Sequence, residues 1–355
     1  MRVAQHSPTL FEVSDTVAAS EFTEADCSTP AGMQREQLTR LDIDDELRAR
    51  ILPLCRLHVG EVWVDPVAGH RVGVIDACDP VAVRSLTKNE NIDLALNDPP
   101  YNVKLAGKST DALFELTTSE YDEFSSAWIS NCLSSLARHS SFYLWIGANY
   151  KNGFHPIPEI IRLLRSNEDI VPRNWITVRN QRGFGTQKNW MWVRQELLYY
   201  TKGTPFFDVA AEYTDIPRIL RGYYKQVEGN RTENMERSKS DNIRAGNVWV
   251  DIQQVFYRME ENVPGCYAQK PLKSIERILK ASCKPGDVVL DLFSHSGTTL
   301  IAGERLGRRV LTSDADPVYA EISIRRLERL RTTGKLGWQW ESPFPETPIT
   351  LPVGD

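Results

Sequence analysis

The sequence predicts an α/β protein with a doubly wound, mostly parallel sheet. Apolar runs of strand length alternate with amphipathic segments of helix length along most of the 355 residues. The run Ile92–Leu96 is mostly apolar, as in a strand that is covered on both faces. Proline and glycine mark the ends of several expected helices. A chain of this length can bury a large core.

The first half of the chain starts with a polar, acidic arm and continues into alternating elements. Residues 1–36 show no hydrophobic period and are expected to be disordered or loosely attached. The expected elements that follow are a helix at Asp42–Leu57, a hairpin at Gly60–Asp76 that turns at Pro66–Gly69, strands at Arg71–Cys78 and Ile92–Asn97, a helix at Tyr121–His139, a strand at Ser141–Ala148, a helix at His155–Asn167, and strands at Asn174–Asn180 and Glu196–Gly203.

The second half returns to this alternation after a break. Residues Phe206–Gly265 are polar, basic and aromatic, and we interpret them as an inserted region. The elements after it are a helix at Pro271–Cys283, a strand at Asp287–Ser294, a helix at Thr298–Gly307, a strand at Arg308–Ala315 and a helix at Asp316–Leu330 with Asp316 as its N-cap. From Glu341 to Asp355 the chain is too rich in proline for a core and is expected to form a tail.

The net charge of −5 hides an uneven distribution. Residues 1–50 contain five Lys/Arg and ten Asp/Glu, so this segment alone accounts for the negative balance. Within the rest, Arg218–Gly246 holds seven basic residues against four acidic ones. The acidic average therefore does not exclude nucleic acid as a partner.

Several classes of protein are excluded by what the sequence lacks. No apolar run is long enough to span a membrane, and the N-terminus has no basic region followed by an apolar core. The six cysteines form no Cys-x-x-Cys pair, and Cys55 and His58 have no second ligand pair that would complete a zinc site. We therefore expect a cytoplasmic protein with reduced thiols, no membrane contact and no metal.

An unusual corner follows the strand at Ile92–Asn97. Asp98 places a carboxylate at the end of the strand, and Pro99 and Pro100 fix two φ angles near −65° and remove two backbone donors. Tyr101 adds an aromatic ring. A rigid corner rich in acceptors is well suited to hold an amino group.

A second informative stretch is DVVLDLFSHSGTTLIAGERLG (Asp287–Gly307). It combines a strand, a tight Ser/Gly turn and a helix, which is the geometry that binds an adenosyl or nucleotide group at the edge of a sheet. Gly297 allows close approach of the backbone to a ligand. Acidic residues follow the next strand, about twenty positions on, where ribose hydroxyls need acceptors. By itself this stretch also fits a purely structural βαβ turn.

Together the two stretches resemble the amino-methylating DNA methyltransferases that use S-adenosylmethionine. The family's catalytic motif, (Asp/Asn/Ser)-Pro-Pro-(Tyr/Phe), is matched by Asp98-Pro99-Pro100-Tyr101. Its cofactor motif, Asp-Pro-Phe-x-Gly-Ser-Gly-Thr-Thr, is similar to Asp291–Thr299, and its Thr-Gln-Lys-Pro element is similar to Ala268–Pro271. The similarity extends over about Gly73 to Leu330. Two departures stand out: Leu292 replaces the usual proline and His295 a usual glycine.

The resemblance implies a class I S-adenosylmethionine-dependent methyltransferase fold in circularly permuted order. Because the catalytic motif precedes the cofactor motif, the order is similar to that of the β group, whose target-recognition region lies between the two. The expected organisation is an arm at 1–36, a catalytic half at 37–205, a target-recognition insert at 206–265, a cofactor-binding half at 266–335 and a tail at 336–355. The implied methyl donor is S-adenosylmethionine.

The resemblance also implies roles for individual residues. Asp98, Pro99, Pro100 and Tyr101 are the expected catalytic residues, with Tyr101 stacking on a base flipped out of the duplex. The expected cofactor-binding residues are Asp291, Phe293, Ser294, His295, Ser296, Gly297, Thr298, Asp314, Asp316, Asp76, Gln269, Lys270 and Pro271. For Asp316 we prefer the N-cap role, and a surface position is nearly as well supported for Asp76. His295 either narrows the cofactor pocket, contacts the cofactor's carboxylate, or is tolerated because Gly297 still makes the turn, and we prefer the last.

Double-stranded DNA is the implied partner. The basic residues expected to contact it are Arg218, Arg221, Lys225, Arg231, Arg237, Lys239, Arg182 and Lys188, because arginine and lysine contact phosphates and base edges. A solvated charged loop is the alternative for this segment. The resemblance is compatible with a homodimer, with a separately encoded restriction endonuclease, and with a prokaryotic or phage protein found at the nucleoid.

Three alternatives stay open at this point. Asp-Pro-Pro-Tyr accompanies adenine N6 more often than cytosine N4, so adenine is favoured and cytosine is the alternative. An RNA or protein methyltransferase is less well supported, because such enzymes generally place the cofactor motif first. A DNA-binding protein on a decayed methyltransferase fold is the remaining alternative, with His295 as its main support.

Overall fold

The computed structural model describes residues 41, 44–101, 116–147, 156–186, 189–217, 223–227, 230–234 and 240–347. The predicted arm at 1–36 and the last eight residues of the predicted tail, 348–355, therefore lie outside the described residues. Within the described part, no helix is both long and apolar enough to cross a bilayer.

A nine-stranded sheet forms the centre of the protein, in the order β1-β2-β13-β12-β3-β4-β6-β5-β11. Its strands are β1 (Val62–Val64), β2 (Arg71–Val74), β3 (Ile92–Asn97), β4 (Leu136–Ile146), β5 (Ile170–Thr186), β6 (Asn189–Lys202), β11 (Val248–Trp249), β12 (Val288–Asp291) and β13 (Arg309–Asp314). The neighbours from β2 to β4 are all parallel, whereas β1 and β6 pair antiparallel. The mostly parallel α/β fold is confirmed.

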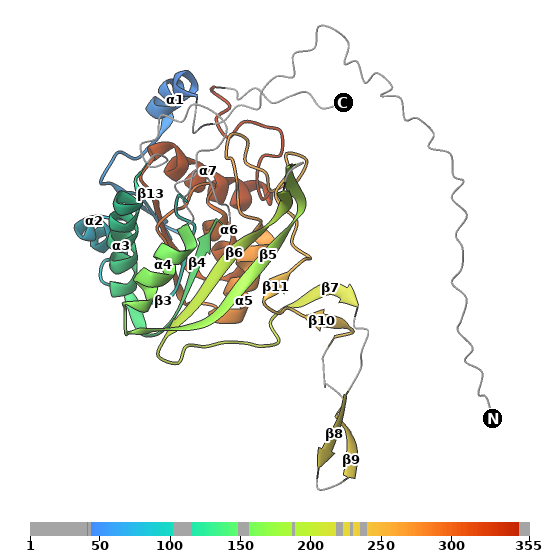
Figure 1. Ribbon diagram of the computed structural model, residues 1–355. Helices are drawn as coiled ribbons and strands as arrows, with labels where there is room; N and C mark the ends of the chain where they lie inside the picture. Colours follow the sequence, from blue (N-terminus) through green and yellow to red (C-terminus); the bar gives the residue numbers. More distant parts are fainter. Residues whose placement is uncertain are drawn as a thin grey trace, which may run out of the picture. The chain divides into compact units, whose positions relative to one another are not determined.

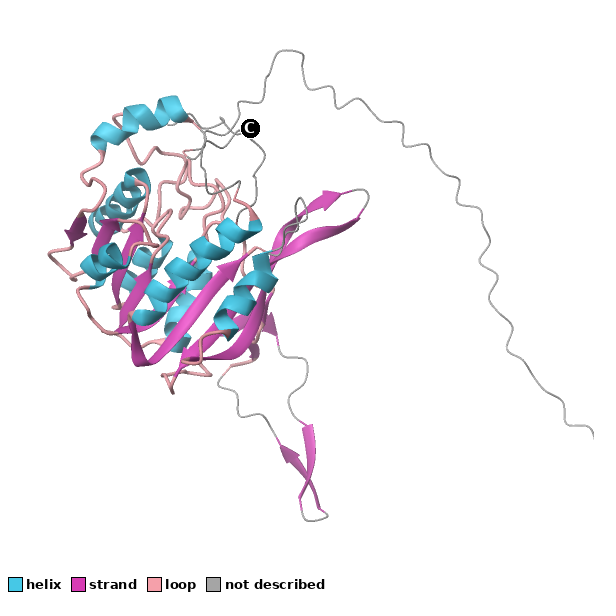
Figure 2. Cartoon of the chain, turned by 60° about the vertical axis from the view of Figure 1, so that its left-hand side comes forward, coloured by secondary structure: helices cyan, strands magenta, loops and turns pink. Residues whose placement is uncertain are grey.

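Helices cover both faces of the sheet (Figures 1 and 2). The helices are α1 (Asp45–Ile51), η1 (Leu52–Leu54), α2 (Pro80–Thr87), α3 (Thr118–Ser134), α4 (Pro156–Arg165), α5 (Leu272–Ser282), α6 (Thr298–Leu306) and α7 (Pro317–Thr333). The core on one face joins α5, α6 and α7 to the sheet, and the core on the other joins α2, α3 and α4. Strand β4 shows the alternation: Tyr143 and Trp145 belong to the first core, and Phe142 and Leu144 to the second. This is the doubly wound arrangement.

The predicted helix at Tyr121–His139 has the wrong ends. Helix α3 begins at Thr118, after a capping box in which Thr117 and Glu120 satisfy each other's backbone amides. It ends at Ser134, and β4 already begins at Leu136. The apolar residues at the start of a buried strand continued the helical period, so periodicity alone could not separate the two elements.

The prediction that the chain from Glu341 onward stays outside the core is wrong at Phe344. Its ring is fully buried in a third core beside Trp338, Leu41 and residues of α1 and α7. The guanidinium of Arg325 lies 4.6 Å from the centre of the same ring. Proline does not prevent burial of a single aromatic ring in a segment that lacks regular secondary structure.

The region predicted as an insert contains several short strands. Strand β7 (Tyr213–Pro217) pairs with β10 (Asn242–Arg244), and β8 (Tyr223–Val227) pairs with β9 (Asn230–Asn234), each as a separate antiparallel sheet. Strand β11 instead joins the central sheet beside β5. The segment thus returns to the main fold at Val248 before α5 begins.

Candidate active site

The order of the strands places the two informative stretches side by side. Strand β3 carries the Asp-Pro-Pro-Tyr corner, and β12 carries the Ser/Gly turn. The two strands are parallel neighbours, with Val289 opposite Leu94 and Leu290 opposite Ala95. Because the strands are parallel, both corners lie at the same edge of the sheet.

Two side chains of β3 extend the connection beyond the paired residues. At the start of β12, the Val288 amide donates to Asp93 Oδ2 at 2.8 Å. At the end, the Leu292 amide donates to Asn97 Oδ1 at 3.0 Å. The Asn97 side chain is fully buried and also donates through Nδ2 to the sulfur of Cys132. These bonds connect the Asp-Pro-Pro-Tyr corner (Asp98–Tyr101), called here the acceptor corner, to the turn after β12 (Phe293–Gly297), called here the cofactor turn.

The acceptor corner is held by contacts on several sides. The Tyr101 hydroxyl donates to Asp98 Oδ1, and the Tyr121 hydroxyl donates to the Pro100 carbonyl at 3.2 Å. The Tyr101 ring packs on Gly147, where an added Cβ would lie 2.9 Å from Tyr101 Cδ2. Burial raises the pKa of Tyr101 well above its ordinary value, so its hydroxyl stays protonated and donates.

The turn between β12 and α6 depends on two residues with left-handed backbone. His295 has φ of 44° and Gly297 has φ of 73°. A Cβ on Gly297 would lie 2.9 Å from the Cα of Ser323, so glycine is required for space as well as for conformation. The His295 ring packs against Tyr319, with 4.8 Å between ring centres. The chain therefore makes the family's glycine turn with a histidine at one of its positions.

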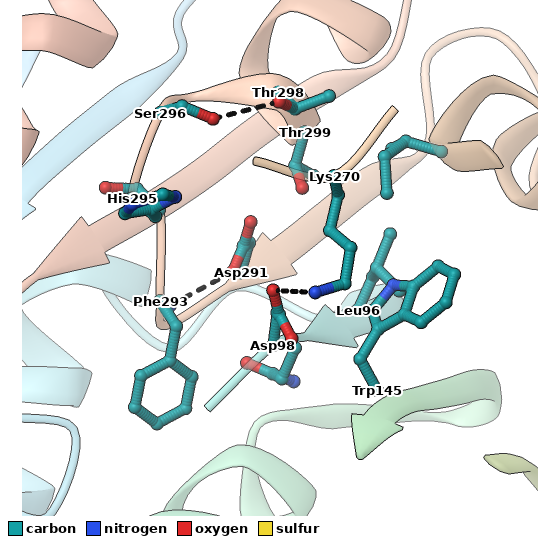
Figure 3. A pocket seen from close by; sticks show the side chains of 13 residues that line it. Leu96, Asp98, Trp145, Lys270, Asp291, Phe293, His295, Ser296, Thr298 and Thr299 are labelled. Atoms are coloured by element: carbon teal, nitrogen blue, oxygen red, sulfur yellow. Dashed lines mark hydrogen bonds and ion pairs between the residues drawn. The ribbon is translucent and has the colours of Figure 1, made fainter. Parts of the chain in front are cut away.

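A pocket opens between the acceptor corner and this turn (Figure 3). Its lining residues are Leu96, Asn97, Asp98, Trp145, Lys270, Ile275, Asp291, Phe293, Ser294, His295, Ser296, Thr298 and Thr299. The structure thus brings the predicted catalytic Asp98 together with seven of the predicted cofactor residues, from Lys270 to Thr298. These residues come from segments almost two hundred positions apart.

The lining has features that fit an adenosyl cofactor with polar ends. The buried hydroxyl of Ser294 has no hydrogen-bond partner among the described residues. Asp291 is 4% exposed, and burial raises the pKa of its carboxyl to about 7. The ring of Phe293 is partly buried and lies edge-on to Trp128, with 5.2 Å between ring centres. A donor or acceptor on a ligand would satisfy Ser294, and a cation would favour the ionised form of Asp291.

Other predicted cofactor residues lie outside the lining of this pocket. Gln269 is buried, where its amide donates to the Glu261 carbonyl and accepts from the Val263 amide. Pro271 is the N-cap of α5. Asp76 is exposed, and its carboxylate accepts from the Cys78 amide. These contacts account for the three residues structurally.

The two acids after β13 differ in their contacts. Asp314 accepts the amides of His295 and Asp316, at 2.9 and 3.1 Å. Burial, together with the charge of Asp316, raises the pKa of Asp314 to about 7. Asp316 caps α7 by accepting the Val318 amide at 2.9 Å, and it pairs with Arg48 at 2.6 Å. The predicted N-cap is confirmed, and Asp314 braces the cofactor turn from behind.

The model of the family N6_N4_Mtase, described as DNA methylase, matches residues 92–325. The match includes both motifs and covers well over half of the chain. The chain belongs to this DNA methylase family. Its methyl donor is S-adenosylmethionine.

Individual relatives agree with this assignment. The Type II methyltransferase M.HpaI of Haemophilus parainfluenzae is 29% identical over 247 residues, which cover 70% of this chain and 71% of the relative. The Type II methyltransferase M1.MboII of Moraxella bovis is 29% identical over 275 residues, which cover 73% and 96%. The structure of the PvuII DNA methyltransferase (cytosine-N4-specific) matches with a TM-score of 0.51 and 15% identity, covering 71% of this chain and 84% of that one. This last similarity supports the fold.

The residues predicted to contact DNA are mostly outside the described part of this DNA methylase. Arg218, Arg221, Arg237, Lys239 and Lys188 fall there. By backbone position, Arg182 lies on β5, Lys225 on β8 and Arg231 on β9. The Trp190 side chain, two positions after Lys188 in the sequence, is 89% exposed at the start of β6.

Several residues of the site were missed by sequence reasoning. Asn97 ends β3, Trp145 lies near the end of β4, and Gly147 follows β4. A polar residue or a glycine at the end of a buried strand was the available signal for Asn97 and Gly147, whereas Trp145 reads as an ordinary core residue. Arg326 is fully buried on α7, where it donates to the Ser296 carbonyl at 2.8 Å and to the Glu261 carbonyl at 3.1 Å. It holds the cofactor turn against the segment before Lys270. In the sequence, the only signal for Arg326 is an arginine at a position of α7 where the helical period places apolar residues.

Proposed function

We propose that this chain is a site-specific DNA methyltransferase that methylates the N6 amino group of adenine in a base flipped out of the duplex. The observation that carries the proposal is the shared pocket, in which the Asp98 carboxylate faces the turn at Asp291–Thr299. Family membership supports the reaction and the donor. The choice of base rests on the Asp-Pro-Pro-Tyr motif.

The reaction needs acceptors because an exocyclic amino nitrogen is a poor nucleophile, its lone pair being delocalised into the ring. S-adenosylmethionine supplies an electrophilic methyl group on a sulfonium. Asp98 and the Pro99 carbonyl accept the hydrogens of the amino group and favour a more tetrahedral nitrogen. The Pro100 carbonyl already accepts a hydrogen bond from the Tyr121 hydroxyl, and this bond positions the Asp98–Tyr101 corner. Positioning and electrostatic fit then provide the catalysis.

The residues of the cofactor turn and its neighbours provide the contacts for S-adenosylmethionine. We assign the cofactor's adenine ring to Phe293 and its methionine end to Asp291 and Ser294. The orphaned Ser294 hydroxyl supports this assignment because it needs a polar partner. The Asp291 carboxyl accepts the Phe293 amide at 3.0 Å and is buried in the same pocket, where a cationic ligand group would favour its ionised form. We assign Asp314 to the ribose on the spacing of the family motif alone, because it lies outside the lining of the pocket and its carboxylate accepts the amides of His295 and Asp316.

The target side uses Tyr101 and the basic segment. Tyr101 stacks on the flipped base, which must leave the duplex because its amino group is otherwise paired. The target-recognition region predicted at 206–265 is confined to the part before Val248, where the chain joins the central sheet, and its arginines and lysines contact phosphates and base edges. The exposed Trp190 supports an additional contact from the β5–β6 hairpin.

The biological setting follows from the relatives. Because the two relatives described above are named Type II methyltransferases, we place this chain in a restriction–modification setting, in the cytoplasm of a prokaryote or phage-infected cell. A separately encoded endonuclease of the same specificity is then the expected partner.

The test is expression of the chain in a bacterial host that lacks amino-methylation of its own, followed by sequencing that detects modified bases. We expect N6-methyladenine at one short sequence throughout the genome. The Asp98→Ala variant, expressed at the same level, should leave that sequence unmodified. N4-methylcytosine at a defined sequence would move the assignment to cytosine, and unmodified DNA from a soluble, folded chain would contradict the proposal.

A further inference from the structure

Among the described residues that line the pocket, Lys270 is the one lysine or arginine, and His295 is the other basic side chain. Its side chain is 9% exposed, and its ammonium lies 2.5 Å from Asp98 Oδ2. Its other polar contact is the Tyr101 hydroxyl at 3.4 Å. Both contacts belong to the acceptor corner.

Aromatic rings complete the surroundings of this ammonium. Its nitrogen lies 5.3 Å from the centre of the Trp145 ring and 5.6 Å from the centre of the Tyr101 ring. Figure 3 shows the nitrogen directed at Asp98, with the Trp145 indole beside it. These distances are those of cation–π contacts, which help to hold a desolvated ammonium.

The consequence concerns the availability of Asp98. Its Oδ1 accepts from Tyr101 and its Oδ2 accepts from Lys270, so both oxygens of the carboxylate are engaged. Because each carboxylate oxygen can accept a second hydrogen bond, an amino group that is to use Asp98 as an acceptor has to share an oxygen with one of these donors or displace it. Lys270 is the more mobile of the two, since a lysine side chain rotates about four bonds, whereas the Tyr101 ring packs on Gly147.

We propose that Lys270 is a placeholder for the target amino group, and that its ammonium must leave Asp98 before a base can be methylated. The inference rests on the proposed function. A protonated lysine nitrogen is tetrahedral and donates to Asp98 in the way the reacting nitrogen must. In the free enzyme it neutralises a carboxylate that shares a pocket with Asp291.

Two cofactor analogues test this inference by binding alone. S-adenosylhomocysteine has an uncharged sulfur at the position of the sulfonium, whereas sinefungin carries an amino group in place of the transferable methyl. In the wild-type chain Lys270 competes with that amino group for Asp98. We therefore expect Lys270→Met to increase the preference for sinefungin over S-adenosylhomocysteine roughly tenfold, the effect of one charge-assisted hydrogen bond. Isothermal titration calorimetry measures both affinities.

Matched variants separate the placeholder role from general damage. Lys270→Leu should behave like Lys270→Met because neither side chain donates a hydrogen bond, and Lys270→Arg should keep the wild-type preference because it keeps the cation. Lys273→Met removes another lysine of the same segment, which pairs with Asp251, and should leave the preference unchanged. Adding Asp98→Asn to Lys270→Met should abolish the gain. Thermal unfolding of each variant confirms that it is folded.

The outcomes distinguish the two proposals. If the wild type binds both analogues and the neutral variants show its preference, the placeholder role is overturned while the proposed function stands. If the increased preference for sinefungin persists when Asp98→Asn is added to Lys270→Met, the placeholder role is also overturned, since the amino group of sinefungin would then not be using Asp98. A folded wild-type chain that binds neither analogue would overturn the proposed function, and this inference with it.

Discussion

The buried side-chain carbonyl of Asn97 accepts a hydrogen bond from the backbone amide of Leu292 at 3.0 Å. It joins the residue directly before Asp98 to the residue directly after β12. Leu292 stands where the family usually has proline, and proline has no amide hydrogen to donate. This departure from the family motif therefore permits a direct link between the two halves of the site.

We expect Asn97→Ala to reduce methyl transfer at least tenfold and to lower the free energy of unfolding by roughly 1–3 kcal/mol, because a buried amide loses its acceptor. Denaturant unfolding and single-turnover methylation measure the two effects. Asp93→Ala is the matched control, since it breaks a similar bond between the same strands at their other end. If both variants lose turnover equally, Asn97 has no special role in positioning the site.

We expect Asp98→Ala to bind S-adenosylhomocysteine while losing at least about a hundredfold in methylation rate, as for loss of a positioned polar contact in catalysis. The loss should appear in kcat, because the acceptor acts on the reacting amino group. Single-turnover methylation of DNA carrying the recognised sequence provides the measurement. Retained turnover would defeat the assignment of Asp98.

The buried Asp291 should make stability depend on pH. Burial raises the pKa of its carboxyl from the ordinary 3.8 to about 7. A raised pKa favours the folded state while the group is protonated, and this contribution is lost as the pH rises from about 4 to 7. Asp291→Asn should therefore gain stability relative to wild type over that window, by up to about 4 kcal/mol. Urea unfolding at pH 5 and pH 8 measures it; a pH-independent difference would contradict the shift.

At position 295, glycine should stabilise the protein more than alanine does, the reverse of the usual order. Its φ of 44° lies in the left-handed region, where a Cβ costs about 1 kcal/mol. Both His295→Gly and His295→Ala lose the contact with Tyr319. We expect the glycine variant to be more stable than the alanine variant by about 1 kcal/mol, in thermal or denaturant unfolding. The opposite order would place this residue outside the left-handed region.

The basic insert should carry the salt dependence of DNA binding. Replacing Arg218 and Arg221 together by alanine should weaken binding and reduce the slope of log K against log salt by about 2, because two phosphate contacts are lost. Fluorescence anisotropy at several salt concentrations measures the slope. The control pair is Arg50 and Arg84, both exposed outside this segment. An unchanged slope in the Arg218/Arg221 variant would move recognition elsewhere.

Much of the fold could be predicted because local sequence patterns determine where many of the strands and helices begin and end. The strands at β3 and β12, the helix that begins at Thr298 and the cap at Asp316 all follow from apolar runs, proline and short polar residues. The end of α3 could not be predicted, because the apolar start of β4 continued its period. The burial of Phe344 could not be predicted either, since it depends on a core formed by distant elements.

The sequence by itself determined the two corners, their chemistry and the family to which they belong, because each corner is a continuous motif whose residue types have a physical role. Only the tertiary structure decided that β12 lies against β3, that Asn97 links the strands, and that Lys270 is paired with Asp98. These contacts join residues more than 170 positions apart along the chain. Such pairings depend on strand order and side-chain packing, which no local pattern encodes.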